Sequence, residues 1–87
     1  MSFAETSAAR DFERYCFANN PNKMNMFEFA GNGFYAYPVG RRGNSLYYQR
    51  VGRTSRYVGE TGAIYTFRGN GRVTWSDGHR IIRLRGC

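Results

Sequence analysis

The sequence predicts an α+β fold, in which one N-terminal helix packs on a twisted antiparallel sheet of five or six strands. Two observations favour it. Apolar residues near the start of the chain have helical spacing, and the spacing changes to a period of two after Pro21. The chain also contains seven Phe, seven Tyr and one Trp, a composition typical of sheets. We expect meander order, a sheet that can curl toward a barrel, and a single domain, 1–87.

A helix is expected over residues 6–20. Hydroxyl side chains at its start can accept hydrogen bonds from the first free backbone N–H groups. Phe12 and Cys16 are four residues apart, and together with preceding alanines they form a narrow apolar stripe. Pro21 ends the helix, because proline disfavours a helical conformation in the residue before it.

Residues 26–86 are expected to form the β-rich, basic part of the domain. Aromatic residues alternate on both sides of two Gly-Asn-Gly turns, at 31–33 and 69–71, and such turns tolerate the positive φ of a tight hairpin. Residues 26–42 and 64–80 align without a gap and share six identities. Three of the identities lie within the turn, where hairpin geometry alone selects Gly and Asn, so the two segments can have become similar independently. An internal duplication stays open as the alternative.

The formal net charge of +7 is distributed unevenly along the chain. Residues 1–30 carry a net charge of −1, whereas residues 31–87 carry ten arginines against two acids, a net charge of +8. Arginine suits bidentate contacts with phosphate and carboxylate groups. The asymmetry therefore indicates a polyanionic or acidic partner for the β-rich part.

The two cysteines, Cys16 and Cys87, are too few for the disulfide framework of a small secreted domain. We expect Cys16 to be a small core residue and Cys87, at the end of the chain, to be mobile. Residues 1–15 are interrupted by charges, unlike a secretory signal, and no apolar run has membrane-spanning length. These features predict a soluble, cytoplasmic protein without membrane contact.

Catalysis is not favoured by the sequence. His79 is the only histidine, and a general acid–base pair needs a second titratable group beside it. Asp77 is close in sequence, but a turn Asp more often bonds its own backbone. The chain has no zinc-ligand set and no phosphate-binding glycine motif, so no metal or cofactor is expected. A small ribonuclease-like toxin using His79 and Glu60 stays as a lesser alternative.

Arginine interleaved with tyrosine is the strongest functional feature, above all in residues 47–57, which contain no acid. Arginine can neutralise phosphates while tyrosine stacks on an unpaired base. On the last strand Arg83 and Arg85 share one face, because alternate strand residues point the same way. The candidate binding residues are Arg41, Arg42, Tyr47, Tyr48, Arg50, Arg53, Arg56, Tyr57, Arg68, Arg72, Arg83 and Arg85.

These residues predict a small, non-catalytic protein that binds nucleic acid, DNA or RNA, or a nucleoprotein. The alternative is a protein–protein inhibitor or accessory factor, of the kind found in phages and mobile elements. Such a factor would use the same surface to occlude an acidic or nucleic-acid-binding site on its target. A homodimer is also open, because an unpaired edge strand can pair with another chain.

Overall fold

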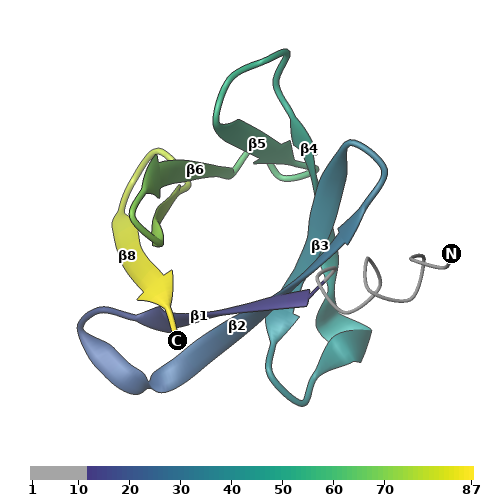
Figure 1. The fold of residues 1–87 in the computed structure, drawn as a ribbon. Helices are drawn as coiled ribbons and strands as arrows, with labels where there is room; N and C mark the ends of the chain where they lie inside the picture. Colours follow the sequence, from purple (N-terminus) through teal and green to yellow (C-terminus); the bar gives the residue numbers. More distant parts are fainter. Residues whose placement is uncertain (1–11) are drawn as a thin grey trace, which may run out of the picture.

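The computed structural model describes residues 12–87 and shows a closed barrel of eight antiparallel strands (Figure 1). Each strand pairs with its sequence neighbours, and β1 pairs with β8 to close the sheet. The strands are β1 (Phe12–Phe17), β2 (Asn20–Ala30), β3 (Gly33–Pro38), β4 (Leu46–Arg50), β5 (Arg56–Gly59), β6 (Ile64–Gly69), β7 (Arg72–Ser76) and β8 (Ile81–Gly86), and a short 3-10 helix, η1 (Arg42–Asn44), lies between β3 and β4.

The predicted α+β fold is wrong, because residues 12–17 form strand β1 where the sequence predicted a helix. The backbone of β1 pairs with β2 on one side and β8 on the other. Tyr15 is buried and Phe17 packs against the core, which is the period of two of a strand. Phe12 and Cys16 also have helical spacing, so this short apolar pattern fits either structure. Residues 6–11 of the predicted helix lie outside the described residues.

The strand number also differs from the five or six expected. The barrel has eight strands, of which β1 was not expected at all. In addition, β2 begins earlier than expected, at Asn20, so Pro21 lies within a strand and does not end a helix. Pro21 is exposed near the start of that strand, a position where proline is tolerated. Within residues 12–87, no helix has both the length and the apolar character needed to cross a membrane.

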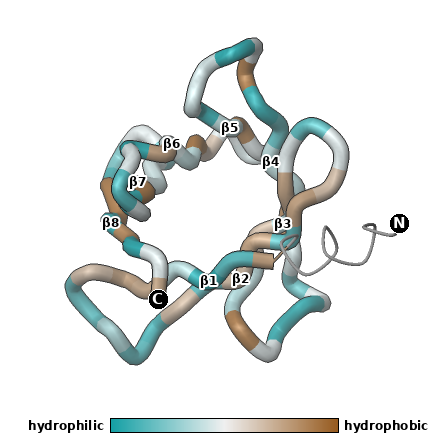
Figure 2. The backbone as a smooth tube through the Cα atoms, in the orientation of Figure 1, coloured by the Kyte–Doolittle hydropathy of each residue, from teal (hydrophilic) through white to brown (hydrophobic). Residues whose placement is uncertain are grey.

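Aromatic rings fill the barrel. Phe27 and Phe34 are fully buried on neighbouring strands, and their rings stack with centroids 4.4 Å apart. Tyr65 packs edge-on against both Phe27 and Tyr48, with centroid distances of 4.8 Å and 4.7 Å. Hydrophobic and hydrophilic residues interleave along the strands in Figure 2, as expected when a small barrel has a packed interior.

Both Gly-Asn-Gly segments form the hairpin turns that the sequence predicted. The first connects β2 to β3 with Gly31 at φ 62°, and the second connects β6 to β7. In the second turn Asn70 and Gly71 have φ values of 55° and 74°. Glycine and asparagine adopt this left-handed conformation more readily than other residues, which explains the shared turn sequence.

Cys16 and Cys87 form a disulfide, with Cα atoms 5.8 Å apart. The expectation of a core Cys16 and a mobile Cys87 is therefore wrong. The bond lies at the seam where β1 meets β8, since Cys16 is the register partner of Arg85 and the N–H of Cys87 donates to the Arg14 carbonyl. It connects residues 71 positions apart and covalently fastens the two strands that close the barrel.

Candidate anion-binding surface

The outer face of β7 and β8 carries arginine because the strand register turns the intervening apolar residues inward. Val73 on β7 is the register partner of Leu84 on β8, and both are buried in the core. Neighbouring residues on a strand point to opposite faces. Arg72 and Arg85, the next register pair, therefore point outward, and Arg83 shares this outward face with Arg85, as the alternation predicted.

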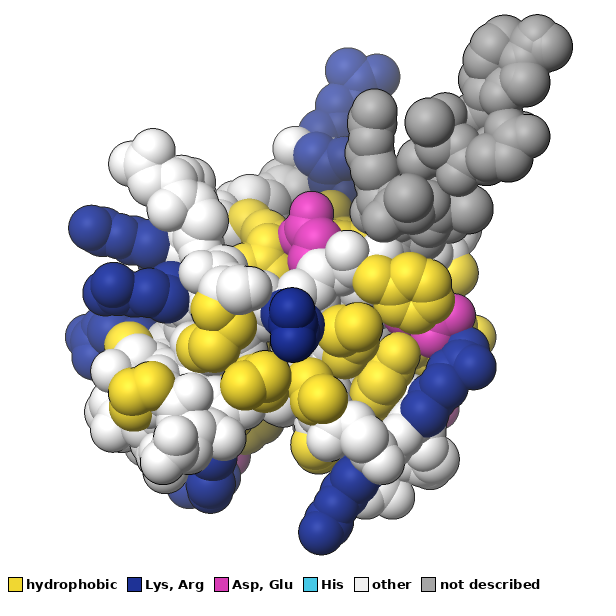
Figure 3. Space-filling model, turned by 60° about the horizontal axis from the view of Figure 1, so that its bottom comes forward, with side chains coloured by type: hydrophobic (Ala, Val, Ile, Leu, Met, Phe, Trp, Pro, Cys, Tyr) yellow, Lys and Arg dark blue, Asp and Glu magenta, His cyan; other side chains and the backbone are white. Residues whose placement is uncertain are grey.

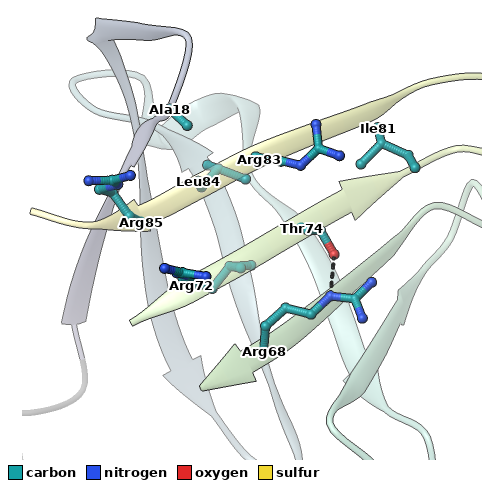
Figure 4. Close-up of a pocket in the computed structure, with 9 residues that line it drawn as sticks. Ala18, Arg68, Arg72, Thr74, Ile81, Arg83, Leu84 and Arg85 are labelled. Carbon is teal, nitrogen blue, oxygen red and sulfur yellow. Dashed lines mark hydrogen bonds between the residues drawn. The ribbon is translucent and has the colours of Figure 1, made fainter. Parts of the chain in front are cut away.

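An open groove of about 450 Å³ runs over this face (Figure 4). Its charged residues come from three consecutive strands, β6, β7 and β8, and its rim reaches the β1–β2 turn at Ala18. We call it the arginine groove. It is lined by Ala18, Arg68, Arg72, Val73, Thr74, Ile81, Arg83, Leu84 and Arg85.

The four arginines form two groups along the arginine groove. Arg72 and Arg85 are register partners, and their guanidinium groups lie toward one end in Figure 4. Arg68 and Arg83 extend toward the other end, on either side of Thr74. The Nε of Arg68 donates to Thr74 Oγ1 at 3.3 Å, and Thr74 is the register partner of Arg83. Thr74 thus holds the Arg68 guanidinium at the end of the groove where Arg83 also lies.

The electrostatics of the arginine groove favour an anion. Like charges directly opposite each other destabilise an antiparallel pair, and Arg72 lies opposite Arg85. None of the described residues that line the groove is an acid. Glu28 is instead paired with Arg42 at 2.7 Å, and Asp77 accepts backbone hydrogen bonds in the β7–β8 turn. An anion bound in the groove would relieve the repulsion.

The basic surface continues onto β5. Arg56 is the register partner of Thr66, Thr66 of Thr74, and Thr74 of Arg83, so these residues form a row across four strands. Neighbouring strands are about 4.8 Å apart, which gives the row a span of roughly 14 Å between its two arginines. We call the following outward residues the arginine face: Arg56, Thr66, Arg68, Arg72, Thr74, Arg83 and Arg85.

Two tyrosines of the predicted binding set point into the barrel. Tyr48 is buried, and its hydroxyl accepts a hydrogen bond from Trp75 Nε1 at 3.2 Å. Tyr57 is half-buried, and its ring packs against Phe34 with centroids 5.0 Å apart. Because their rings pack in the core, neither offers a free face for stacking on a base.

Other predicted residues have structural partners on the opposite half of the barrel. The guanidinium of Arg42 donates to both carboxylate oxygens of Glu28, from Nε at 3.1 Å and from Nη2 at 2.7 Å. Tyr47 points outward, and its hydroxyl donates to the Ala30 carbonyl at 2.8 Å. These contacts connect β2 with the β3–β4 connection and with β4, away from the arginine groove.

The β4–β5 loop uses one predicted arginine for its own structure. Arg50 Nε donates to the Thr54 carbonyl at 2.8 Å, so the hydrogen bond connects the start of the loop with a residue near its end. Arg53, within the same loop, is exposed, and so is Arg41 after β3. The structure therefore gathers the four arginines of the groove and places Arg56 in the same row, away from Arg41 and Arg42. Arg50 and Arg53 do not line the groove, but they lie at the start of, and within, the loop that leads to Arg56.

The β7–β8 turn contains His79 and Asp77, the titratable group closest to it in sequence. Asp77 Oδ1 accepts the backbone N–H groups of His79 and Arg80 at 2.9 Å and 3.0 Å, so the predicted turn interaction is confirmed. These hydrogen bonds lower the pKa of the Asp77 carboxyl. The carboxylate is occupied by the turn backbone, and among residues 12–87 no group of three potential metal ligands is found.

Sequence reasoning missed the threonines that accompany the arginines, and although the alternation places Ile81 on the face of Arg83 and Arg85, Ile81 was not among the candidate binding residues. Thr66 and Thr74 lie between Arg56 and Arg83 in the row, and Ile81 is 59% exposed at one end of the groove. The alternation of "RVTWS" indicates that Thr74 shares a face with Arg72. The alignment of Thr66 with Thr74 depends on the register that the second Gly-Asn-Gly turn sets.

Comparison with known proteins gave no match to a family model, a curated protein sequence or a solved structure. The function must therefore be argued from the site.

Proposed function

We propose that the protein is a non-catalytic nucleic-acid-binding protein whose arginine face contacts the phosphate backbone. The observation that carries the proposal is the direct opposition of Arg72 and Arg85 in a groove whose described lining contains no acid. Guanidinium groups bind phosphate oxygens in a bidentate manner. Phosphates contacting both groups of arginines would offset the repulsion between Arg72 and Arg85.

The arginine face suits the backbone better than the bases. Single-strand binders combine a basic groove with exposed aromatic rings, but Tyr48 and Tyr57 pack inside the barrel. The outward residues of β5–β8 that accompany the arginines are threonine, serine, valine and isoleucine. Phosphate contacts position a protein without reading sequence. We therefore expect binding that tolerates sequence, and no strong preference for single strands.

An acidic protein surface is the second candidate, and Ile81 is the observation that favours it. This side chain is 59% exposed beside Arg83 in the groove. An apolar residue flanked by arginines is typical of protein interfaces. In this alternative the chain is an inhibitor or accessory factor that occludes its target.

The disulfide bears on the compartment. A cytoplasmic location was expected from the sequence, but the cytosol keeps thiols reduced. The Cys16–Cys87 bond closes the seam next to Arg85. We propose that the chain functions in an oxidising compartment, or in the cytoplasm only after it has been oxidised.

Fluorescence anisotropy tests the proposed function. Labelled duplex DNA, single-stranded DNA and RNA are titrated with the oxidised protein between about 50 and 200 mM salt. For duplex DNA, four phosphate contacts, one for each arginine of the groove, predict a slope of log K against log salt of roughly −3.6. Arg72→Ala/Arg85→Ala should reduce its magnitude by roughly 1.8.

The matched control for this titration is Arg41→Ala/Arg53→Ala, which removes the same charge at exposed positions that do not line the arginine groove. It should keep most of the slope, because neither residue lines the groove. If none of the three nucleic acids binds at about 50 mM salt, the nucleic-acid proposal is wrong. An acidic protein then becomes the leading candidate.

A further inference from the structure

A second cleft, of about 660 Å³, opens at one end of the barrel. This end carries the β1–β2 and β3–β4 connections, and its walls come from β1, β2 and the residues after β3. The residues that define its chemistry are Phe17, Lys23, Met24, Asn25, Val39 and Arg41. We call it the mouth cleft. It is separate from the arginine groove, with which it shares no lining residue.

The inner wall of the mouth cleft is part of the barrel interior. Phe17 packs against the core cluster. Asn25 is the register partner of Tyr15, a buried core residue, and its side chain is half-buried. Asn25 Nδ2 donates to the Tyr65 hydroxyl at 3.2 Å. This bond fixes the amide, so the cleft has an oriented polar group at its inner end.

The outer walls are apolar and carry two cations. Val39 is 45% exposed, and its N–H donates to the Met24 carbonyl at 3.3 Å, which connects the two walls. Lys23 and Arg41 are both exposed at the cleft, and none of the described lining residues is an acid. Figure 3, turned to bring the side of β1 and β2 forward, shows hydrophobic side chains gathered on this side of the molecule, with basic and some acidic side chains among and around them.

We propose that the mouth cleft binds a small organic anion with an apolar body, such as an aryl or alkyl carboxylate. Its volume is within the range of small-molecule sites, which are mostly apolar, contain few polar groups and occur at the mouths of β-barrels. The apolar body lies against Phe17, Met24 and Val39, and the anionic group lies near Lys23 and Arg41. An uncharged apolar molecule would contact only the apolar wall of the cleft, and a free inorganic anion would contact only its two cations.

Chemical-shift mapping of the oxidised, ¹⁵N-labelled protein with naphthalene-2-carboxylate tests the proposal. The expected result is a saturable shift of the amides of Lys23 and Arg41 and of the Asn25 side-chain amide. A ligand of this size predicts a Kd on the order of 1 mM. Naphthalene-2-carboxamide, which lacks the charge, and acetate, which lacks the apolar body, should each bind at least about tenfold more weakly.

Two variants and one control test whether naphthalene-2-carboxylate binds in the mouth cleft. Lys23→Ala/Arg41→Ala should weaken naphthalene-2-carboxylate at least about tenfold, and because both side chains are exposed the barrel spectrum should persist. Val39→Glu, at another exposed position, places a carboxylate at the rim and should also weaken binding. Arg72→Ala/Arg85→Ala removes the same charge from the arginine groove and should bind like the parent protein.

Three results would each overturn the proposal. The carboxamide could bind as tightly as the carboxylate, or Lys23→Ala/Arg41→Ala could leave the Kd unchanged. The third is the absence of saturable shifts at the mouth cleft up to about 10 mM ligand, ten times the expected Kd. Because the probe carries no phosphate and Lys23→Ala/Arg41→Ala leaves the arginine face intact, none of these results bears on nucleic-acid binding.

Discussion

Arg72 and Arg85 lie directly opposite each other on β7 and β8, and none of the described residues that line their groove is an acid. Repulsion between opposed cations costs stability. The barrel keeps the pair on an outward face, beside a third and a fourth arginine. Under the proposed function, an anion that enters the groove would offset this repulsion, which links the fold to the function that we propose.

Arg72→Thr should increase stability and weaken nucleic-acid binding. The substitution removes the like-charged pair and introduces a residue favoured in strands, which should raise the free energy of unfolding by about 0.2–1 kcal/mol. It should also reduce the magnitude of the salt slope by roughly 0.9. Urea denaturation and anisotropy measure the two effects. Arg53→Thr, in the exposed β4–β5 loop, should change neither quantity appreciably.

Removing the disulfide should destabilise the barrel at its closing seam. Cys16→Ser/Cys87→Ser releases a crosslink between residues 71 positions apart, for which the chain-entropy model predicts a loss of about 4 kcal/mol. Urea denaturation of this variant is compared with the reduced and alkylated parent protein, which should lose a similar amount. Unchanged stability in both samples would show that the β1–β8 hydrogen bonds alone hold the seam.

Tyr48→Phe should lower stability without affecting nucleic-acid binding. The variant removes the acceptor of the Trp75 Nε1 hydrogen bond inside the barrel. Because this hydrogen bond is only partly buried, its loss should cost about 0.5–1.5 kcal/mol, which thermal or urea unfolding can measure. An affinity for duplex DNA equal to that of the parent protein would support the inward placement of this ring. Weaker binding at equal folded fraction would restore Tyr48 to the binding surface.

Stability should decline at alkaline pH. Burial raises the pKa of Tyr65 and of Tyr48, and burial, followed by the hydrogen bond to Glu13, raises that of Tyr15. The unfolded chain ionises its tyrosines near a pKa of about 10. The contribution is therefore complete below pH 10 and is lost as pH rises above it. Urea midpoints measured across this range should fall, and less steeply in Tyr65→Phe.

The local features of the fold could be predicted from the sequence, whereas the long-range ones could not. The turns at 31–33 and 69–71 depend on the φ preferences of Gly and Asn, which act within a few residues. The strand at 12–17 becomes one because β8 pairs with it from the other end of the chain. The disulfide depends on the same closure, since it brings Cys16 beside Cys87.

The binding surface shows the same division. Alternation along the last strand places Arg83 and Arg85 on one face, and this follows from strand geometry alone. The same rule, applied to the adjacent Tyr47 and Tyr48, indicates that only one of them can face solvent. Their inclusion together in the candidate surface ignored it. The opposition of Arg72 and Arg85 required the register between β7 and β8, which the sequence does not state.

Chemical-shift mapping with a short DNA duplex tests the central claim most directly. At low salt, ¹⁵N-labelled, oxidised protein should show its largest shifts at the backbone and side-chain N–H groups of Arg68, Arg72, Arg83 and Arg85, with smaller shifts at Arg56. These shifts should collapse as salt rises. Shifts centred instead on Tyr47 and Arg53, or the absence of any shift, would contradict the assignment of the arginine face as the nucleic-acid-binding surface.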